Sequence, residues 1–211
     1  MTAHPTADPP ASAPFPRCWW AGPSEEYLRY HDTEWGIPVT NDQRLFEKIC
    51  LEGFQAGLSW LTILRKRENF RRAFLDFDHE QVARFTSKSV DRLLTDPGIV
   101  RHRGKIEAVI NNAQRARELV REHGSLGAYL WRFEPQPESR PAELTEEWLR
   151  RSSTSPESIA LSKDLKFRGW KFVGPTTMYA FMQAMGLVND HVVGCSARPQ
   201  AVAARAKLKI P

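Results

Sequence analysis

The sequence has 211 residues, of which 30 are Lys or Arg and 25 are Asp or Glu, so its formal net charge is +5. This length is enough for one domain with a sizeable core, and the modest positive charge suits a polyanionic partner without requiring one. No apolar run approaches the roughly 20 residues of a membrane span, and the N-terminus lacks the basic and apolar regions of a secretory signal. We therefore expect a cytoplasmic monomer with no membrane partner.

The two ends of the sequence differ in composition from its middle. Residues 1–16 hold five prolines among small polar side chains and have almost nothing to bury, which predicts a disordered leader. Residues 17–197 are expected to form the fold. Residues 198–211 are basic and are treated as a C-terminal tail, for which two interpretations are open: a solvated segment, or one that touches nucleic acid.

The first half of the folded part reads as helices. Asp42 can cap a helix that carries Leu45 and Ile49 at helical spacing. A second apolar helix follows a break at Gly57, and residues 82–94 suggest shorter helices. Two helices joined by a short turn therefore precede a series of smaller ones.

Helical signals also dominate the second half. One helix is expected to begin near Arg103, and a polar connection rich in proline follows at residues 135–141. Ser155 with Pro156 offers a helix start, and Pro175 opens another helix that Gly186 would end. No stretch alternates with a period of two, so the sequence predicts an all-α fold.

Cysteine and histidine occur as two pairs at opposite ends of the folded part. Cys18 and His31 lie in one motif, while His191 and Cys195 have three residues between them. Thiolate and imidazole are the ligands that tetrahedral zinc prefers, although packing explains either pair alone better, and only the two pairs together make zinc an equal alternative. Four protein ligands would leave no position for water, so zinc here would be structural. Cys50 lies on the apolar face of a predicted helix, which argues for packing.

Aromatic residues are dense between residues 19 and 60, and a carboxylate lies among them. The aromatic set is Trp19, Trp20, Tyr27, Tyr30, Trp35, Phe46, Phe54 and Trp60. Core packing explains any one of them, but Glu52 within an apolar stretch must be exposed, paired or used, because burying it alone is costly. Electron-rich rings around one acceptor suit an extruded, electron-poor base.

The stretch LSKDLKFRGWKFVGPTTMYAFMQA predicts two helices joined by a turn that holds Gly169 and Gly174. Such a hairpin can present backbone N–H groups to a phosphate, with Lys166, Arg168 and Lys171 adding positive charge. An ordinary connection between packed helices explains the same pattern. The basic stretch RHRGK, at residues 101–105, is a second candidate for phosphate contact.

Six motifs, RCWW, YHDTEWG, CLEGFQAGLSW, RHRGKIEAVI, RGWKFVG and GLVNDHVVGC, occur in this order between residues 17 and 195. Together they closely resemble the bacterial 3-methyladenine DNA glycosylase I family. The resemblance implies a helix-hairpin-helix fold and removal of 3-methyladenine from alkylated double-stranded DNA in base excision repair, by base flipping and hydrolysis of the N-glycosidic bond. Free 3-methyladenine would be the product. It also implies one zinc ion held by Cys18, His31, His191 and Cys195.

Roles for individual residues follow from their positions in these motifs. The resemblance implies that Trp60 stacks on the base, that Glu52 and Tyr30 hydrogen-bond to it, and that Leu58 fills the gap left in the duplex. The remaining pocket candidates are Trp20, Tyr27 and Trp35. The hairpin candidates for DNA contact are Gly169, Lys171, Gly174 and Thr176.

The sequence also limits the chemistry. Lyase-type relatives carry a nucleophilic Lys where this chain has Pro175 and Thr176, so a Schiff base is not expected. Asp190 is not assigned as a catalyst. Phe54 stands where a polar residue is expected, which would alter contacts beside the pocket. Two rival functions remain: a zinc-stabilised DNA-binding module without catalysis, and a glycosylase with broader substrates such as 7-methylguanine.

Overall fold

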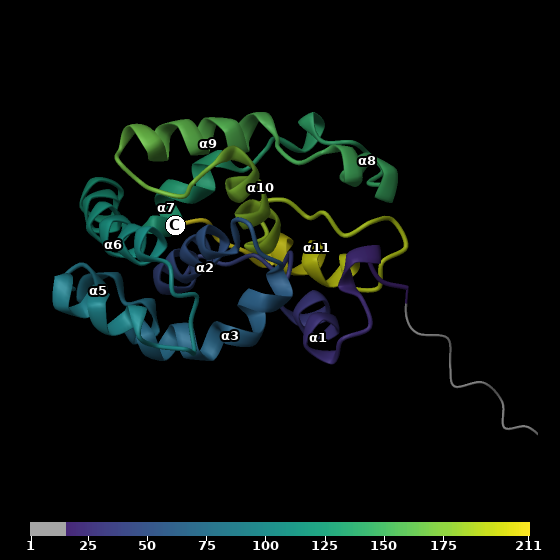
Figure 1. The fold of residues 1–211 in the computed structure, drawn as a ribbon. Helices are drawn as coiled ribbons and strands as arrows, with labels where there is room; N and C mark the ends of the chain where they lie inside the picture. Colours follow the sequence, from purple (N-terminus) through teal and green to yellow (C-terminus); the bar gives the residue numbers. More distant parts are fainter. Residues whose placement is uncertain (1–15) are drawn as a thin grey trace, which may run out of the picture.

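The computed structural model describes residues 16–211, and this part of the chain is helical with no strand (Figure 1). The all-α prediction is therefore confirmed for it. The longer helices are α2 (Asp42–Gln55), α3 (Trp60–Ala73), α6 (Arg103–His123), α9 (Pro156–Phe167), α10 (Pro175–Ala184) and α11 (Arg198–Lys207). The shorter helices are α1 (Glu25–Thr33), α4 (His79–Val82), α5 (Ser87–Leu94), α7 (Leu126–Leu130) and α8 (Glu146–Arg151). The 3-10 turns are η1 (Trp19–Ala21), η2 (Leu75–Phe77), η3 (Trp131–Phe133) and η4 (Pro137–Ser139).

Helix α2 begins one residue from the predicted cap. The side chain of Asn41, not Asp42, accepts a hydrogen bond from the Arg44 N–H at 3.0 Å. Asp42 is the first helical residue, and its Oδ1 accepts a hydrogen bond from the Gly127 N–H at 2.9 Å. The cap was misplaced because Asn and Asp are equally good caps, and because Asp42 instead connects α2 to α7.

Helices α9 and α10 begin where the sequence predicted, and α10 also ends as predicted. Ser155 caps α9 in a capping box with Ser158, and Pro156 occupies the first turn. Helix α10 starts at Pro175, and the chain turns at Gly186, whose φ is +74°. A Cβ at Gly186 would lie 2.5 Å from the Pro38 backbone nitrogen, so only glycine fits this turn.

Helix α2 lies at the centre of the fold and packs against α3, α6, α7 and α10, while α9 covers the other side of α10 (Figure 1). Its apolar residues are fully buried, and so are three polar ones: Glu47, Lys48 and Glu52. Phe54 is 1% exposed with its ring 4.5 Å from that of Phe70, so it belongs to the core and is not beside the pocket as expected.

The segments at the two ends of the described chain lie side by side. The Pro16 carbonyl accepts a hydrogen bond from the Ser196 N–H at 2.9 Å. Residues 198–207 of the basic tail form α11, which buries Ala201 and pairs Arg205 with Glu134 at 2.5 Å. The leader expected over residues 1–16 lies outside the described residues except for Pro16. Among the described residues, no helix is both long and apolar enough to span a membrane.

Candidate active site

The four predicted metal ligands meet in one buried cluster. Cys18, His31, His191 and Cys195 are 0–4% exposed, and their ligand atoms all lie within 4.8 Å of one another. Cys195 Sγ lies 3.4 Å from His191 Nδ1 and 3.5 Å from His31 Nε2. Sulfur and nitrogen ligands of a tetrahedral zinc ion lie about 3.5 Å apart. The cluster could therefore hold a metal ion of that size.

The outer atoms of the two imidazoles are also occupied. His31 Nδ1 lies 2.8 Å from Asp32 Oδ1, and Asp32 in turn pairs with Arg17 at 2.7 Å. His191 Nε2 donates to the Trp35 carbonyl at 3.0 Å. These bonds fix the orientation of both rings and leave Nε2 of His31 and Nδ1 of His191 facing the cluster, as hydrogen bonds to the outer nitrogen of a metal-binding histidine do.

Burial of the cluster disfavours charge on its members. It raises the pKa of the Cys18 thiol to about 12 and lowers the pKa of His191 to about 4. Neutral imidazole is the form that binds metal, whereas a thiolate needs a nearby cation to offset its burial. The four side chains are therefore a donor set that could bind a metal ion, with the ion offsetting the cost of buried thiolates.

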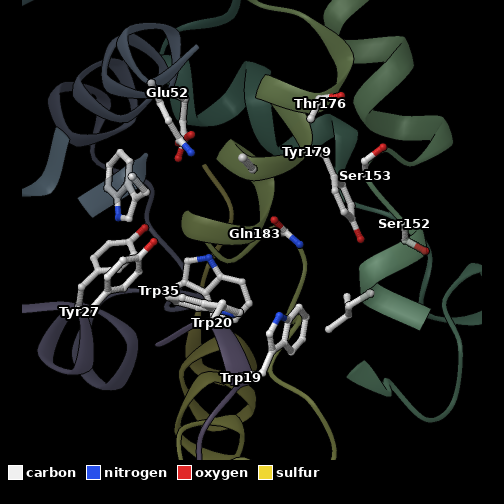
Figure 2. Close-up of a pocket in the computed structure, with 15 residues that line it drawn as sticks. Trp19, Trp20, Tyr27, Trp35, Glu52, Ser152, Ser153, Thr176, Tyr179 and Gln183 are labelled. Carbon is white, nitrogen blue, oxygen red and sulfur yellow. The ribbon is translucent and has the colours of Figure 1, made fainter. Parts of the chain in front are cut away.

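A cavity of about 300 Å³ lies beside the cluster, with aromatic rings on one side and α8 and α10 on the other. Its volume is in the range of small-molecule sites. Figure 2 shows Tyr27, Trp20 and Trp35 gathered on one side, and Tyr179, Ser152 and Ser153 on the other. All six predicted pocket residues line this cavity: Trp20, Tyr27, Tyr30, Trp35, Glu52 and Trp60.

The aromatic wall of the cavity is continuous with the cluster. The ring of Trp20 lies 4.7 Å from that of Trp35 and 5.1 Å from that of His31, measured between centroids. Trp35 also makes an edge contact with His191 at 4.7 Å. The ligands of the cluster therefore support two of the rings that face the cavity.

Glu52 is 5% exposed and is paired, which answers the question that the sequence raised. Its partner is Lys48, one helical turn earlier on α2, whose Nζ lies 2.8 Å from Glu52 Oε1. Lys48 Nζ also donates to Tyr30 Oη at 2.9 Å. Burial, with a smaller contribution from Glu52, raises the pKa of Tyr30 well above its ordinary value, so Tyr30 stays a hydroxyl.

One face of α10 forms a wall that the sequence interpretation missed; Thr176, expected to contact DNA at the hairpin, lies on this wall. Thr176, Ala180 and Gln183 line the cavity at helical spacing, together with Tyr179. The sequence signal that could have revealed this wall was the recurrence of Thr176 and Gln183 on one face of an otherwise apolar helix. Asp190, which does not line the cavity, accepts hydrogen bonds from Tyr179 Oη at 2.7 Å and Gln183 Nε2 at 2.9 Å.

Leu58 lies outside the cavity in the turn between α2 and α3. Its side chain is 42% exposed, and Gly57 before it adopts a φ of +79°. Lys105 Nζ donates to the carbonyls of Phe54 at 2.9 Å and Ala56 at 2.6 Å, which fixes the end of α2. Lys105 is 7% exposed, so this member of RHRGK supports the Leu58 turn and is not available to a phosphate.

The hairpin between α9 and α10 is held by a side chain from α6. Asn112 accepts from the Lys171 N–H at 2.8 Å and donates to the Lys171 carbonyl at 2.9 Å. Gly169 has a φ of +85°, and the Lys171 side chain is exposed. Arg168 pairs with Asp164 and Glu122 at 2.8 and 2.5 Å, so its charge is already compensated.

Comparisons with known proteins agree with this geometry. The model of a family described as methyladenine glycosylase matches residues 20–198. The chain is 50% identical to DNA-3-methyladenine glycosylase 1 of Escherichia coli, across 87% of this chain and 97% of that protein. It is 46% identical to DNA-3-methyladenine glycosylase of Haemophilus influenzae, across 85% and 96%.

Solved structures match as well. The fold is similar to that of 3-methyladenine DNA glycosylase I from Staphylococcus aureus, whose structure describes recognition of 3-methyladenine, with a TM-score of 0.79 and 39% identity. The match covers 87% of this chain and 96% of that one. Glycosylases are hydrolases of N-glycosyl bonds. The cavity, the shared fold and the sequence identity all agree on the family of this protein. The chain belongs to the methyladenine glycosylase family.

Proposed function

We propose that this enzyme excises 3-methyladenine from alkylated DNA by receiving the flipped base in the aromatic cavity. The observation that carries the proposal is the buried acceptor Glu52 at the edge of a cavity lined by Tyr30 and Trp60. Stacking and hydrogen bonding to an exposed base edge are how enzymes of this kind read an extruded nucleotide. The similarity to enzymes named for 3-methyladenine supports the same substrate.

The chemical demand on the protein is small. Adenine methylated at N3 is cationic while attached to deoxyribose, so its glycosidic bond is weak and breaks to leave a neutral base. Water then bonds to the sugar C1′ and gives up a proton to solvent. Glu52 and Tyr30 favour the departing base by hydrogen bonding, and no protein nucleophile takes part.

Contacts outside the cavity would hold the duplex. The exposed Leu58, on a turn that Lys105 fixes, is placed to fill the space that the flipped base leaves. The residues of the helix-hairpin-helix would position a phosphate, with Gly169 and Gly174 shaping the turn, Thr176 in the first turn of α10 and Lys171 supplying charge. Such contacts fix the register of the DNA without reading its sequence.

The Cys/His cluster would hold one structural zinc ion. Two thiolates and two imidazoles satisfy its four positions, and the distances of 3.4–3.7 Å between their sulfur and nitrogen atoms fit it. Zinc supplies cross-linking energy here and no chemistry, since no position is left for water. The protein's own contribution is to place Trp20 and Trp35 against the cluster, so that the wall of the cavity is rigid.

The test is product analysis on defined lesions. Duplexes that carry a single 3-methyladenine, 3-methylguanine or 7-methylguanine are incubated with the purified enzyme, and released bases are separated by chromatography. We expect free 3-methyladenine in large excess over the other two. Binding of alkylated DNA without base release would instead support a DNA-binding module, and comparable release of 7-methylguanine would contradict the proposed specificity.

A further inference from the structure

Lys48 is a buried cation directly behind the proposed base site. Its side chain is 5% exposed, and its Nζ meets three groups: Glu52 Oε1 at 2.8 Å, Tyr30 Oη at 2.9 Å and the Trp60 ring centroid at 3.3 Å. A carboxylate, a hydroxyl oxygen and an aromatic face are all acceptors. They match the three N–H donors of an ammonium, so the contacts fit the charged form of Lys48.

Lys48 does not reach the cavity itself. Tyr30 and Trp60 line both the large cavity and a smaller one behind it, whereas Lys48 lines only the smaller one. It occupies Glu52 Oε1, a lone pair of Tyr30 and one face of Trp60. Within residues 16–211 no hydrogen bond occupies Glu52 Oε2 or the Tyr30 hydroxyl proton, so both are left for a ligand, and Trp60 also lines the large cavity. Lys48 is thus a positioning residue that fixes which atoms the cavity offers.

Two neighbouring arginines are paired with carboxylates other than Glu52. Arg67 Nη1 lies 2.6 Å from Glu34 Oε2, and Arg71 Nε lies 2.8 Å from Glu47 Oε1. Burial lowers the pKa of Lys48, and Glu52 acts against this shift. With Lys48 in place, the negative charge of Glu52 is compensated as well. An aromatic cavity that held Glu52 alone would attract cations more strongly than neutral molecules.

We propose that Lys48 determines charge selectivity: by neutralising Glu52, it makes the cavity favour the neutral departing base over the cationic base still attached to deoxyribose. This inference rests on the proposed function, since it concerns the same cavity. An enzyme accelerates a reaction when it binds the departing form more tightly than the substrate. Binding both forms equally tightly gives no acceleration. Removing the ammonium should strengthen binding of a cation relative to a neutral base.

Two free ligands test this selectivity. One is 3-methyladenine, measured under mildly alkaline conditions where it is neutral, and the other is 3,9-dimethyladeninium, a fixed cation that carries a methyl group in place of the sugar. Affinities for both are measured by calorimetry for the wild type, Lys48→Met, Glu52→Gln and the double variant. We expect Lys48→Met to lower the ratio of neutral to cationic affinity about tenfold, because a unit charge a few ångströms away is removed.

The four proteins should fall in a fixed order. Glu52→Gln, which leaves the cation uncompensated, should give the highest ratio, although both affinities should fall because the carboxylate acceptor for the base is lost. Lys48→Met should give the lowest ratio. The double variant buries no unpaired charge from this pair, so its affinity ratio should lie near the wild-type value. It also keeps the test possible if Lys48→Met fails to fold. Arg71→Met is the matched control, because it removes a nearby cation that is paired with Glu47 and Glu68 and not with Glu52, and it should leave the ratio unchanged.

Two results would overturn the inference and one would overturn its basis. A Lys48→Met ratio equal to the wild-type value, with the protein folded, means that Lys48 is only structural. If the affinity ratio of the double variant equals that of Glu52→Gln within experimental error, Lys48 is again only structural. If the folded wild type binds neither ligand, the proposed function itself fails. Lys48→Arg, which keeps the charge, should retain most of the wild-type ratio.

Discussion

The metal cluster and the base cavity lie side by side but are built in opposite ways. In the cluster, the four ligand atoms face one another, and the outer nitrogens of His31 and His191 are bonded to Asp32 and to the Trp35 carbonyl. In the cavity, Trp60 Nε1 is buried with no hydrogen-bond partner among the described residues. Saturated groups suit a permanent structural role, while groups left unpaired suit a ligand that enters and leaves.

The two regions also depend on each other unequally. Trp20 and Trp35 touch both, with Trp20 lying 5.1 Å from His31 and Trp35 lying 4.7 Å from His191. Damage to the cluster should therefore spread into the cavity wall. Substitution of Glu52 should leave the cluster unaffected, because Glu52 is paired with Lys48 and is not a member of the cluster.

The largest effect is expected from breaking the cluster. Cys195→Ser removes one of two thiolates, and we expect loss of bound zinc and a decrease of about 3 kcal/mol or more in the free energy of unfolding, with base release falling as a consequence. Metal analysis and thermal unfolding measure this. Cys50→Ala is the control, because Cys50 is buried away from the cluster. Unchanged zinc content in Cys195→Ser would refute the four-ligand site.

A smaller effect, confined to DNA, is expected from the wedge. Leu58→Ala should slow release of 3-methyladenine from duplex DNA about tenfold, because the gap in the duplex is no longer filled and unstacking is uncompensated. Its affinity for free 3-methyladenine should stay at the wild-type value, since Leu58 does not line the large cavity. Equal loss in both assays would mean that Leu58 shapes the cavity and does not act on the duplex.

The smallest effect is expected at the hairpin. Lys171→Ala should weaken DNA binding a few-fold and reduce the slope of log affinity against log salt by about 1, as the loss of one phosphate contact does. Lys163→Ala is a matched control on α9, exposed but outside the turn. A salt slope that is the same in both variants would remove Lys171 from the DNA contacts.

The sequence predicted parts of both the metal cluster and the base cavity. The Cys and His pairs were found because such pairs have few roles, and Glu52 was found because it is a carboxylate in an apolar stretch. Lys48 was missed, because Lys and Glu four residues apart on a helix usually form an exposed pair. The stretch RHRGK was a candidate for phosphate contact, whereas its Lys105 binds the carbonyls at the end of α2. Whether a long polar side chain turns inward depends on packing from distant helices, which local sequence does not encode.

The far wall of the cavity was missed for a related reason. Tyr179 and Gln183 on α10 are held by Asp190, and Ser152 follows α8, so this wall forms only when segments distant in the chain pack together. The spacing of Thr176, Ala180 and Gln183 on one helical face gave a partial signal. The volume between α10 and the aromatic wall had no signal in the sequence.

The most direct test of the central claim, that Glu52 recognises the base while the cluster only holds the fold, is one measurement on one variant. Glu52→Gln is purified, its zinc content is measured, and the release of 3-methyladenine from methylated duplex DNA is timed with the same sample. We predict full zinc content, a folded protein and release slowed on the order of a hundredfold, the loss typical of one charged contact at a reacting group. Release at the wild-type rate, with zinc bound, would contradict the account.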